Sequence, residues 1–399
     1  MASHALAPLR IADYRRLWIG QVVSVIGDKI DQIAMAMMVY AVTGSMLQMG
    51  IMLGVTMLPA AVFGLPAGVY VDRWDRRRTM IAADLVRAAV VVAIPFVVRY
   101  GVWWAYALAF VASTLALFFV PAKRSLIPDI VPGDDLIAAN SLDNASEAVA
   151  EIVGLAIGAA IVATIGYGLA FTLDGLTFLF SAGMIALITF RQPKLPFPEH
   201  REDFIAETLA GVRAIAASDV MRQLFNVYVA SALFAAASIA VCYALALVRY
   251  HAGAPGVALL DAASAVGILI GSVLVARTGP GHLGAKFLFG ITMFGPAFAL
   301  IAFADSIWVA AILILVSGIA NMFFFIPAIT LFQKLSDSSV RGRVMAANTT
   351  ATRVMMVIGL IVAGALAEKI ALPVLVMAVG LAALVTAGLG WTRRALREA

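Results

Sequence analysis

Charged side chains occur inside stretches that are otherwise hydrophobic, and these are the residues whose types and spacing could do chemistry. Six of them form two groups, each within one hydrophobic run: Asp28, Lys29 and Asp31, then Asp143, Glu147 and Glu151. An ionisable residue at the centre of a membrane helix costs about 2.5–3.5 kcal/mol on insertion scales, so such residues usually face water or a partner. Both groups are therefore candidates for binding a proton or a charged substrate.

The first group belongs to a polar stripe. Gln21, Ser24, Asp28 and Gln32 recur at helical spacing, and Asp31 flanks them. We interpret the stripe as the lining of a water-filled cavity, with a purely structural ion pair as the alternative. Lys29 is rotated by about 100° from Asp28 on a helix, so it can point elsewhere and pair with another helix.

The second group shares one helical face, because its members are four residues apart. Like charges so close resist simultaneous ionisation, and Glu151, at the middle of its run, is the better proton carrier of the three. Asp143 lies near the end of the run, where capping or an interaction with the helix dipole is an equal alternative.

Further charges occur singly or in pairs. Asp261 is another acidic candidate for the binding site, and Arg353 is a cation that could compete with a proton or a substrate for a carboxylate. Asp84 and Arg87 stand three residues apart, and we interpret them as a structural pair.

The composition requires a membrane around these charges. The 399 residues are 63% hydrophobic and 13% charged, with a mean hydropathy of +1.00. Soluble domains average about 45–50% apolar and about 25% charged residues, so this is a membrane protein that crosses the bilayer many times. The single cysteine, Cys242, excludes a disulfide framework and a CxxC metal site, and the N-terminus does not read as a signal peptide.

Twelve hydrophobic runs are long enough to cross a bilayer as helices. We expect them at 17–41, 48–71, 79–99, 102–121, 139–163, 168–190, 223–248, 256–277, 286–303, 306–332, 345–367 and 371–391. Basic residues concentrate in the gaps after even-numbered runs and at both termini, which predicts that both termini are cytoplasmic.

The longest polar stretch divides the chain. We expect an N-terminal bundle of six helices in 1–190, a cytoplasmic linker with an amphipathic helix in 191–222, and a second six-helix bundle in 223–399. An internal repeat supports this division, with chance matching of short Ala-rich segments as the alternative. Its matching pieces are Phe119–Ala122 and Phe325–Ala328, Asn140 and Asn348, and the Gly-Leu pairs Gly154-Leu155 and Gly359-Leu360.

A basic turn carries the most specific spacing in the chain. Its G-x-x-x-D-R-x-x-R-R pattern consists of Gly68, Asp72, Arg73, Arg76 and Arg77. This resembles the gating loop between the second and third helices of the major facilitator superfamily, although Asp75 stands where that family more often has glycine. Because this many arginines cannot lie in hydrocarbon, the charge of the turn by itself predicts that the turn is cytoplasmic.

Other segments resemble the drug and siderophore exporters of that superfamily, and also its lysophospholipid transporters. They are SVIGD at 24–28, FFVPAKRSLIPDIVPGDDLIAANS, and VRGRVMAAN. Only half of the superfamily's antiporter signature is present. Gly154 and Gly158 match it, but Leu155 and Ala159 stand in place of a proline and a glycine. The resemblance implies a substrate site between two halves, with the helices of Glu151 and Asp261 meeting across it, and a packing or hydrogen-bonding role for Asp174.

These observations predict an all-α membrane protein with twelve transmembrane helices in two pseudo-symmetric six-helix bundles, the major facilitator fold. The chain has no nucleotide-binding, hydrolase or zinc-protease motif, so we expect no enzyme, no cofactor and no metal, and a proton gradient as the energy source. We expect a monomer in the plasma membrane that exports a small cationic or zwitterionic amphiphile and binds no nucleic acid. The alternatives are a lysophospholipid or siderophore transporter, a channel, and a sensor or scaffold built on a transporter fold.

Overall fold

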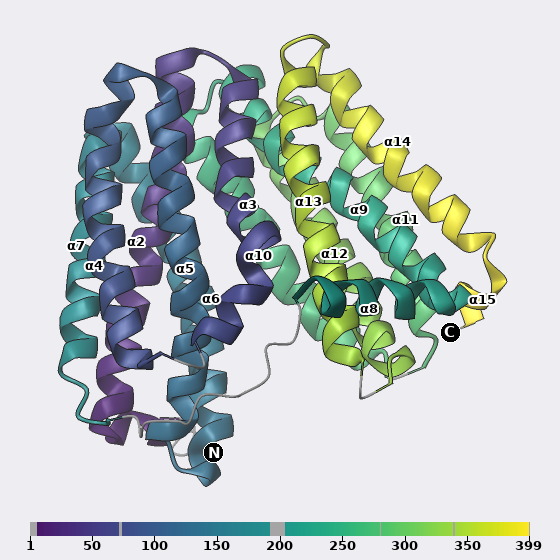
Figure 1. Cartoon of the computed structure of the whole chain (residues 1–399). Coiled ribbons are helices and arrows are strands. Elements are labelled where there is room, and N and C mark those ends of the chain that lie inside the picture. The colour runs from purple at the N-terminus through teal and green to yellow at the C-terminus, as the bar shows by residue number, and fades with distance from the viewer. Residues whose placement is uncertain (1–5, 72–73, 192–203, 280, 338–339, 399) are drawn as a thin grey trace. The chain divides into compact units, whose positions relative to one another are not determined.

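The computed structural model describes residues 6–71, 74–191, 204–279, 281–337 and 340–398, and this part of the chain contains helices and turns without a strand. The main elements of the described residues are twelve long helices, and their course can be followed in Figure 1. The first six are α2 (Ala12–Thr43), α3 (Met46–Val71), α4 (Arg76–Val97), α5 (Val102–Ile130), α6 (Leu136–Thr164) and α7 (Tyr167–Ala186). The other six are α9 (Asp219–Ala244), α10 (Gly253–Arg277), α11 (Leu283–Ala299), α12 (Ile307–Leu335), α13 (Arg341–Ala367) and α14 (Leu372–Trp391).

Each of the twelve predicted hydrophobic runs forms one of these helices, so the all-α membrane fold is confirmed. Among the described residues, 11 helices are long and apolar enough to span a bilayer by length and composition. The long helix outside that set is α2, whose central Asp28, Lys29 and Asp31 exceed the number of charges that an ordinary membrane helix carries. The largest difference in a boundary is at α5, which continues through two prolines to Ile130 instead of ending at residue 121.

Local sequence signals set several helix ends. Asp75 caps α4, since its carboxylate accepts a hydrogen bond from the Arg78 N–H at 2.8 Å. The residue that departs from the family pattern therefore starts the helix after the basic turn. Gly101 and Gly166 have positive φ angles of 139° and 97° in the turns before α5 and α7, a conformation that glycine adopts without strain.

The chain divides into two compact units. The first contains Met1–Thr43 and Val62–His200, and the second contains Gly44–Ala61 and Arg201–Ala399. In the first unit α2 packs on α6 and α7, and α4 packs on α5 and α7. In the second unit α9 packs on α13 and α14, and α11 packs on α12 and α14. The four helix pairs of one unit thus have counterparts, in the same sequence order, in the other.

Glycines allow the helices of the first unit to approach closely. A methyl group on Gly27 of α2 would overlap the side chains of Thr177 and Asp174 on α7. One on Gly154 of α6 would lie 2.7 Å from the Ile26 carbonyl oxygen of α2. Both glycines flank the charged centre of α2, so the backbone of α2 is tightly held where its charges lie.

The repeated Gly-Leu pair occupies equivalent places in the two units. Gly154 lies against α2, the first long helix of its unit, and Gly359 of α13 lies against the Leu233 carbonyl of α9. Leu155 and Leu360 are both buried beside these glycines. The structure therefore gives the sequence repeat a packing role.

The amphipathic helix expected in the linker is α8 (Phe204–Ala217), which lies across the end of α13 in Figure 1. It packs on α13, with Gly211 against the Arg343 carbonyl and Ile215 buried. This helix is thus covered by protein on one face.

Candidate functional site

The charges at the centre of α2 have partners on two different helices. The Asp28 carboxylate accepts a hydrogen bond from Arg87 of α4, with 2.6 Å between Oδ1 and Nη2. The Lys29 ammonium lies 2.5 Å from Glu151 Oε1 of α6. Adjacent positions on a helix differ by about 100°, which is why neighbouring side chains reach different helices. The sequence left the orientation of Lys29 open, and the structure shows it paired with another helix, as the spacing allowed.

Arg87 is the centre of an acidic cluster between α2, α4 and α7. We call it the Arg87 cluster, and it consists of Arg87, Asp28, Asp31, Asp84 and Asp174. The guanidinium also lies over the Phe178 ring, 4.0 Å from its centroid. Asp84 and Asp174 are 0% and 1% exposed, so the cluster reaches deep into the unit.

Many carboxyl oxygens of this cluster lack hydrogen bonds. Asp174 Oδ1 accepts from the Thr177 hydroxyl at 3.2 Å. Among the described residues, no hydrogen-bond partner lies within reach of Asp174 Oδ2 or Asp31 Oδ1, and the Asp84 carboxyl group interacts with the Ser181 hydroxyl of α7. Unpaired buried charges are expensive, and one guanidinium cannot neutralise four carboxylates. The chemistry that such an arrangement supports is the holding and release of protons.

This geometry corrects two predictions. Arg87 forms its ion pair with Asp28 and not with Asp84, three residues before it. The polar stripe of α2 is also not a uniform cavity lining. Gln21 and Ser24 are 7% and 4% exposed, and Gln21 donates to the buried Ser181 hydroxyl of α7 at 3.1 Å. That end of the stripe is buried between helices.

The acidic residues of α6 differ in their surroundings although they are evenly spaced. Asp143 pairs with Lys123 of α5 at 2.8 Å, and Glu151 pairs with Lys29. Glu147, between them, is exposed, and the described residues offer it no ion-pair or hydrogen-bond partner. Lys123 belongs to the segment predicted as a loop, and the continuation of α5 brings it to Asp143.

The candidates in the second unit have aromatic neighbours. The Tyr243 hydroxyl of α9 donates to Asp261 Oδ2 at 3.4 Å. Arg353 of α13 is half-buried and interacts with Tyr228, whose ring stacks on Phe324 with 5.1 Å between centroids. Within the described residues no carboxylate lies within ion-pair distance of Arg353.

The basic turn contacts the ends of neighbouring helices. Arg76 donates to the Ser125 carbonyl at 3.0 Å and pairs with Asp129, both on α5. Arg77 donates to the Ile185 carbonyl at the end of α7, at 3.1 Å. Gly68 lies within α3. Asp72 and Arg73 lie outside the described residues.

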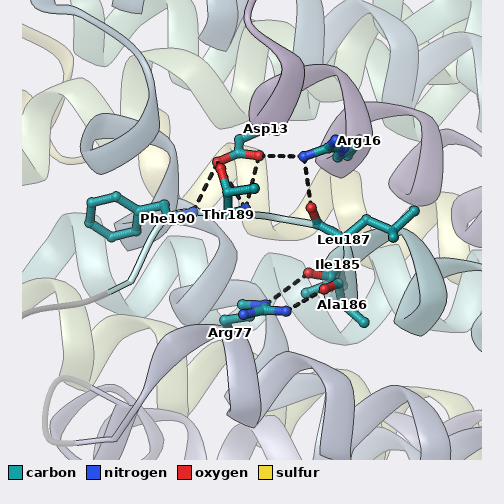
Figure 2. A network of polar contacts seen from close by, with 8 residues as sticks. All are labelled: Asp13, Arg16, Arg77, Ile185, Ala186, Leu187, Thr189 and Phe190. Atoms are coloured by element: carbon teal, nitrogen blue, oxygen red, sulfur yellow. Dashed lines mark hydrogen bonds and ion pairs between the residues drawn. The ribbon is translucent and has the colours of Figure 1, made fainter.

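Sequence reasoning missed a second set of contacts at the same end of α7, shown in Figure 2. Asp13, in the first turn of α2, accepts hydrogen bonds from the N–H groups of Thr189 and Phe190 and from the Thr189 hydroxyl. Arg16 donates to Asp13 and to the Leu187 carbonyl at 2.7 Å. Arg16 and Arg77 therefore both bind the free carbonyl end of α7, where the helix dipole favours cations.

These hydrogen bonds change the acidity of Asp13. Burial alone would raise the pKa of its carboxyl group, but the hydrogen bonds from Thr189, Phe190 and Arg16 outweigh burial. The pKa of Asp13 consequently lies below its ordinary value of 3.8. Asp13 precedes the predicted membrane span, so this group is ionised at neutral pH.

Comparison with known proteins identifies the family. The sequence model of the family described as transmembrane secretion effector matches residues 3–399, almost the whole chain. The chain belongs to this family, within the major facilitator superfamily. It is thus a multi-pass membrane transporter and not an enzyme.

Relatives of this transporter include macrolide efflux protein A of Streptococcus pyogenes, which is 27% identical over 373 residues and 89% of each chain. The multidrug efflux pump Tap of Mycobacterium bovis is 34% identical over 153 residues, 35% of each chain. A bacterial homologue of the iron transporter ferroportin has a similar fold, with a TM-score of 0.76, 18% identity, and 96% and 99% of the two chains covered. That last likeness concerns the fold alone.

Proposed function

We propose that this transporter exports a small cationic amphiphile by alternating access, in exchange for protons. Two relatives named as efflux proteins support export. The observation that carries proton coupling is the Arg87 cluster, in which four carboxyl groups at membrane depth surround one guanidinium.

The proposed proton step follows from charge balance. If every carboxyl group of the cluster were ionised, four negative charges would face one positive charge in a medium of low dielectric constant. Proton binding by Asp84 or Asp174 removes a carboxylate that competes with Asp28 for Arg87 and so strengthens the Asp28–Arg87 pair, whereas proton release from either group weakens it. Because Asp28 lies at the centre of α2 and Arg87 on α4, the protonation state of the cluster biases how these helices are held together.

Two observations indicate the substrate class: the charges of the candidate binding residues, and the substrate in the name of one relative. Carboxylates outnumber cations among the candidate binding residues, which favours a cation. Macrolides that carry a basic amine are the first candidates, because macrolide efflux protein A matches most of the chain. We further propose that the protein acts as a monomer in the plasma membrane with both termini in the cytoplasm, as the distribution of basic residues predicts.

The experiment is accumulation of erythromycin in proteoliposomes with an imposed acidic interior. We expect the wild-type protein to accumulate erythromycin against its gradient and to stop when the pH gradient is collapsed with an ionophore. Asp84→Asn removes one proton-binding group from the cluster without changing its size, so gradient-driven accumulation should fall to the level of empty liposomes. Exchange of labelled for unlabelled erythromycin at equal pH should persist, since that exchange needs no net proton movement.

The matched control is Asp219→Asn, which removes an exposed carboxylate at the first turn of α9 and should leave accumulation unchanged. Accumulation that continues unchanged in Asp84→Asn would contradict the assignment of proton coupling to the cluster. Transport of labelled lysophosphatidylcholine in place of erythromycin would support the lipid alternative.

A further inference from the structure

The Lys29–Glu151 ion pair is the part of the α2 charge system that the proton step above does not use. Both residues lie near the midpoints of their helices, and the two side chains are 24% and 42% exposed. An exposed ion pair at this depth is costly against hydrocarbon, so its open side must be reached by water. This pair is accessible to a solute, unlike Asp84 and Asp174.

We propose that Glu151 binds the cationic group of the transported substrate, and that Lys29 occupies this site as an internal cation when no substrate is bound. This inference rests on the proposed function and deepens it, because it separates the substrate site from the proton site. The ligand class is a monovalent organic cation, such as an alkylammonium or a phosphonium, attached to an apolar body.

Lys29 is better suited to displacement than the other cation at the centre of α2. Arg87 is held by several carboxyl groups and by the face of Phe178, and its side chain is only 11% exposed. Lys29 has a flexible stem, a compact ammonium and one carboxylate partner in contact. Its ammonium also lies 3.4 Å from the Gln32 Oε1 one turn along α2, an acceptor that can hold it after displacement.

The charge count leaves room for one more cation. Glu147 lies one turn before Glu151 on the same helical face and is exposed. Together these two residues offer two carboxyl groups against the single ammonium of Lys29, and a bound cation reduces the repulsion that resists their simultaneous ionisation. A monovalent cation therefore balances the site, with Lys29 shifting toward one carboxylate or toward Gln32.

The backbone beneath the pair is fixed while the charged ends are free. A methyl group on Gly154, three residues after Glu151, would lie 2.8 Å from the Lys29 Cβ, so α6 and α2 touch there. Close packing at this point holds the two helices at a constant separation. Exchange of one cation for another then needs only rotation of the long Lys29 side chain.

The test measures binding of tetraphenylphosphonium to the purified full-length protein. This cation has a charge that does not titrate, so pH effects report on the protein. We expect Lys29→Met to tighten binding about tenfold, because an internal competitor that occupies the carboxylate most of the time is removed. Glu151→Gln should weaken binding, and Lys29→Met should have no further effect in the Glu151→Gln background.

The matched control is Lys123→Met, which breaks the Lys123–Asp143 pair near the start of α6 and should leave the affinity unchanged. If the Lys29–Glu151 pair were only structural, Lys29→Met and Glu151→Gln would both have a lower melting temperature than the wild-type protein. Neither variant would then bind tetraphenylphosphonium more tightly. Unchanged or weaker binding by folded Lys29→Met would overturn the inference.

The two proposals fail in different ways. If the wild-type protein accumulates erythromycin on a pH gradient and binds tetraphenylphosphonium, but Lys29→Met does not bind it more tightly, the substrate site is wrong and the proposed function stands. If Lys29→Met binds more tightly but no pH gradient drives accumulation, proton coupling is wrong and the site stands. No binding of tetraphenylphosphonium to either the wild-type protein or Lys29→Met overturns the site.

Discussion

At the scale of single residues, the structure separates neighbours in sequence. Asp28 and Lys29 differ by one position, yet one joins the Arg87 cluster and the other pairs with α6. Helical spacing allowed Lys29 to leave the stripe, because the rotation per residue is fixed. It could not predict that Arg87 forms its ion pair with Asp28 and not with Asp84, since the ion-pair partner depends on how α2 and α4 pack.

Asp13 is another residue whose role no periodic pattern indicates, because its partner Thr189 is 176 residues away. Its folded pKa is lowered, so the ionised form stabilises the fold above the ordinary value of 3.8, and this contribution is lost as pH falls through the folded pKa. We expect Asp13→Asn to lower the free energy of unfolding by about 1 kcal/mol at pH 7, the ordinary scale of such hydrogen bonds.

Melting temperatures in detergent as a function of pH measure this effect. The difference between the wild-type protein and Asp13→Asn should shrink as pH falls below about 4, because the wild-type carboxylate then becomes neutral as well. Asp219→Asn, on an exposed pair in the first turn of α9, is the control and should give no such difference. A difference in melting temperature that persists at low pH would show that the charge on Asp13 is not the source of its stabilising effect.

At the scale of elements, small residues decide which helices touch. All twelve spans could be predicted from hydrophobicity, because a bilayer requires about 20 apolar residues for each crossing. Their pairing could be predicted only in part, since pairs such as α2 with α7 and α9 with α13 are far apart in sequence. Gly27 and Gly154 show the difference, because the motifs that contain them do not indicate which helix each one meets, and each marks a close contact of α2 in the structure.

Gly27→Ala tests the contact between α2 and α7. The added methyl group would overlap Thr177 and Asp174, so we expect a loss of about 1–3 kcal/mol in stability, as in other overpacked interiors. Gly183→Ala is the matched control on α7, where the added methyl group meets nothing within 4 Å. Thermal melting followed by size-exclusion chromatography should show a lower melting temperature for Gly27→Ala alone. Equal melting temperatures would mean that the helices can separate slightly at no cost.

At the scale of the whole molecule, the two units repeat an architecture but not a chemistry. The same four helix pairings recur in both, as the sequence repeat predicted. The first unit places carboxyl groups and an arginine between its helices, whereas the second places stacked rings such as Phe324 on Tyr228 and Phe294 on Phe298.

One helix does not follow the division that the sequence predicts. The boundary between the two compact units falls inside α3, between Ala61 and Val62. The first part of α3 packs on α13, where a methyl group on Gly50 would lie 2.6 Å from the Leu360 carbonyl oxygen. The chain order alone places all of α3 with the first six helices, because contacts with α13 leave no sequence signal.

Glu368, which follows α13, fixes the start of α3 in this arrangement. Its carboxylate accepts hydrogen bonds from the Ser45 hydroxyl and from the Leu47 N–H at 3.0 Å, and these lower its pKa below the ordinary value of 4.5. Glu368→Gln removes the charge from this cap. A capping interaction contributes about 1 kcal/mol, so amide exchange in the first turn of α3 should be about fivefold faster in the variant.

Hydrogen–deuterium exchange of peptides that cover residues 46–52 measures this effect. Because the folded pKa is lowered, protection in the wild-type protein should hold above pH 4.5 and decrease as pH falls through the folded pKa, apart from the intrinsic change in exchange rate. Lys369→Met, which removes the neighbouring cation but leaves the cap, is the control and should retain most of the protection. Identical exchange in Glu368→Gln and the wild-type protein would mean that close packing around Gly50 alone holds α3 on α13.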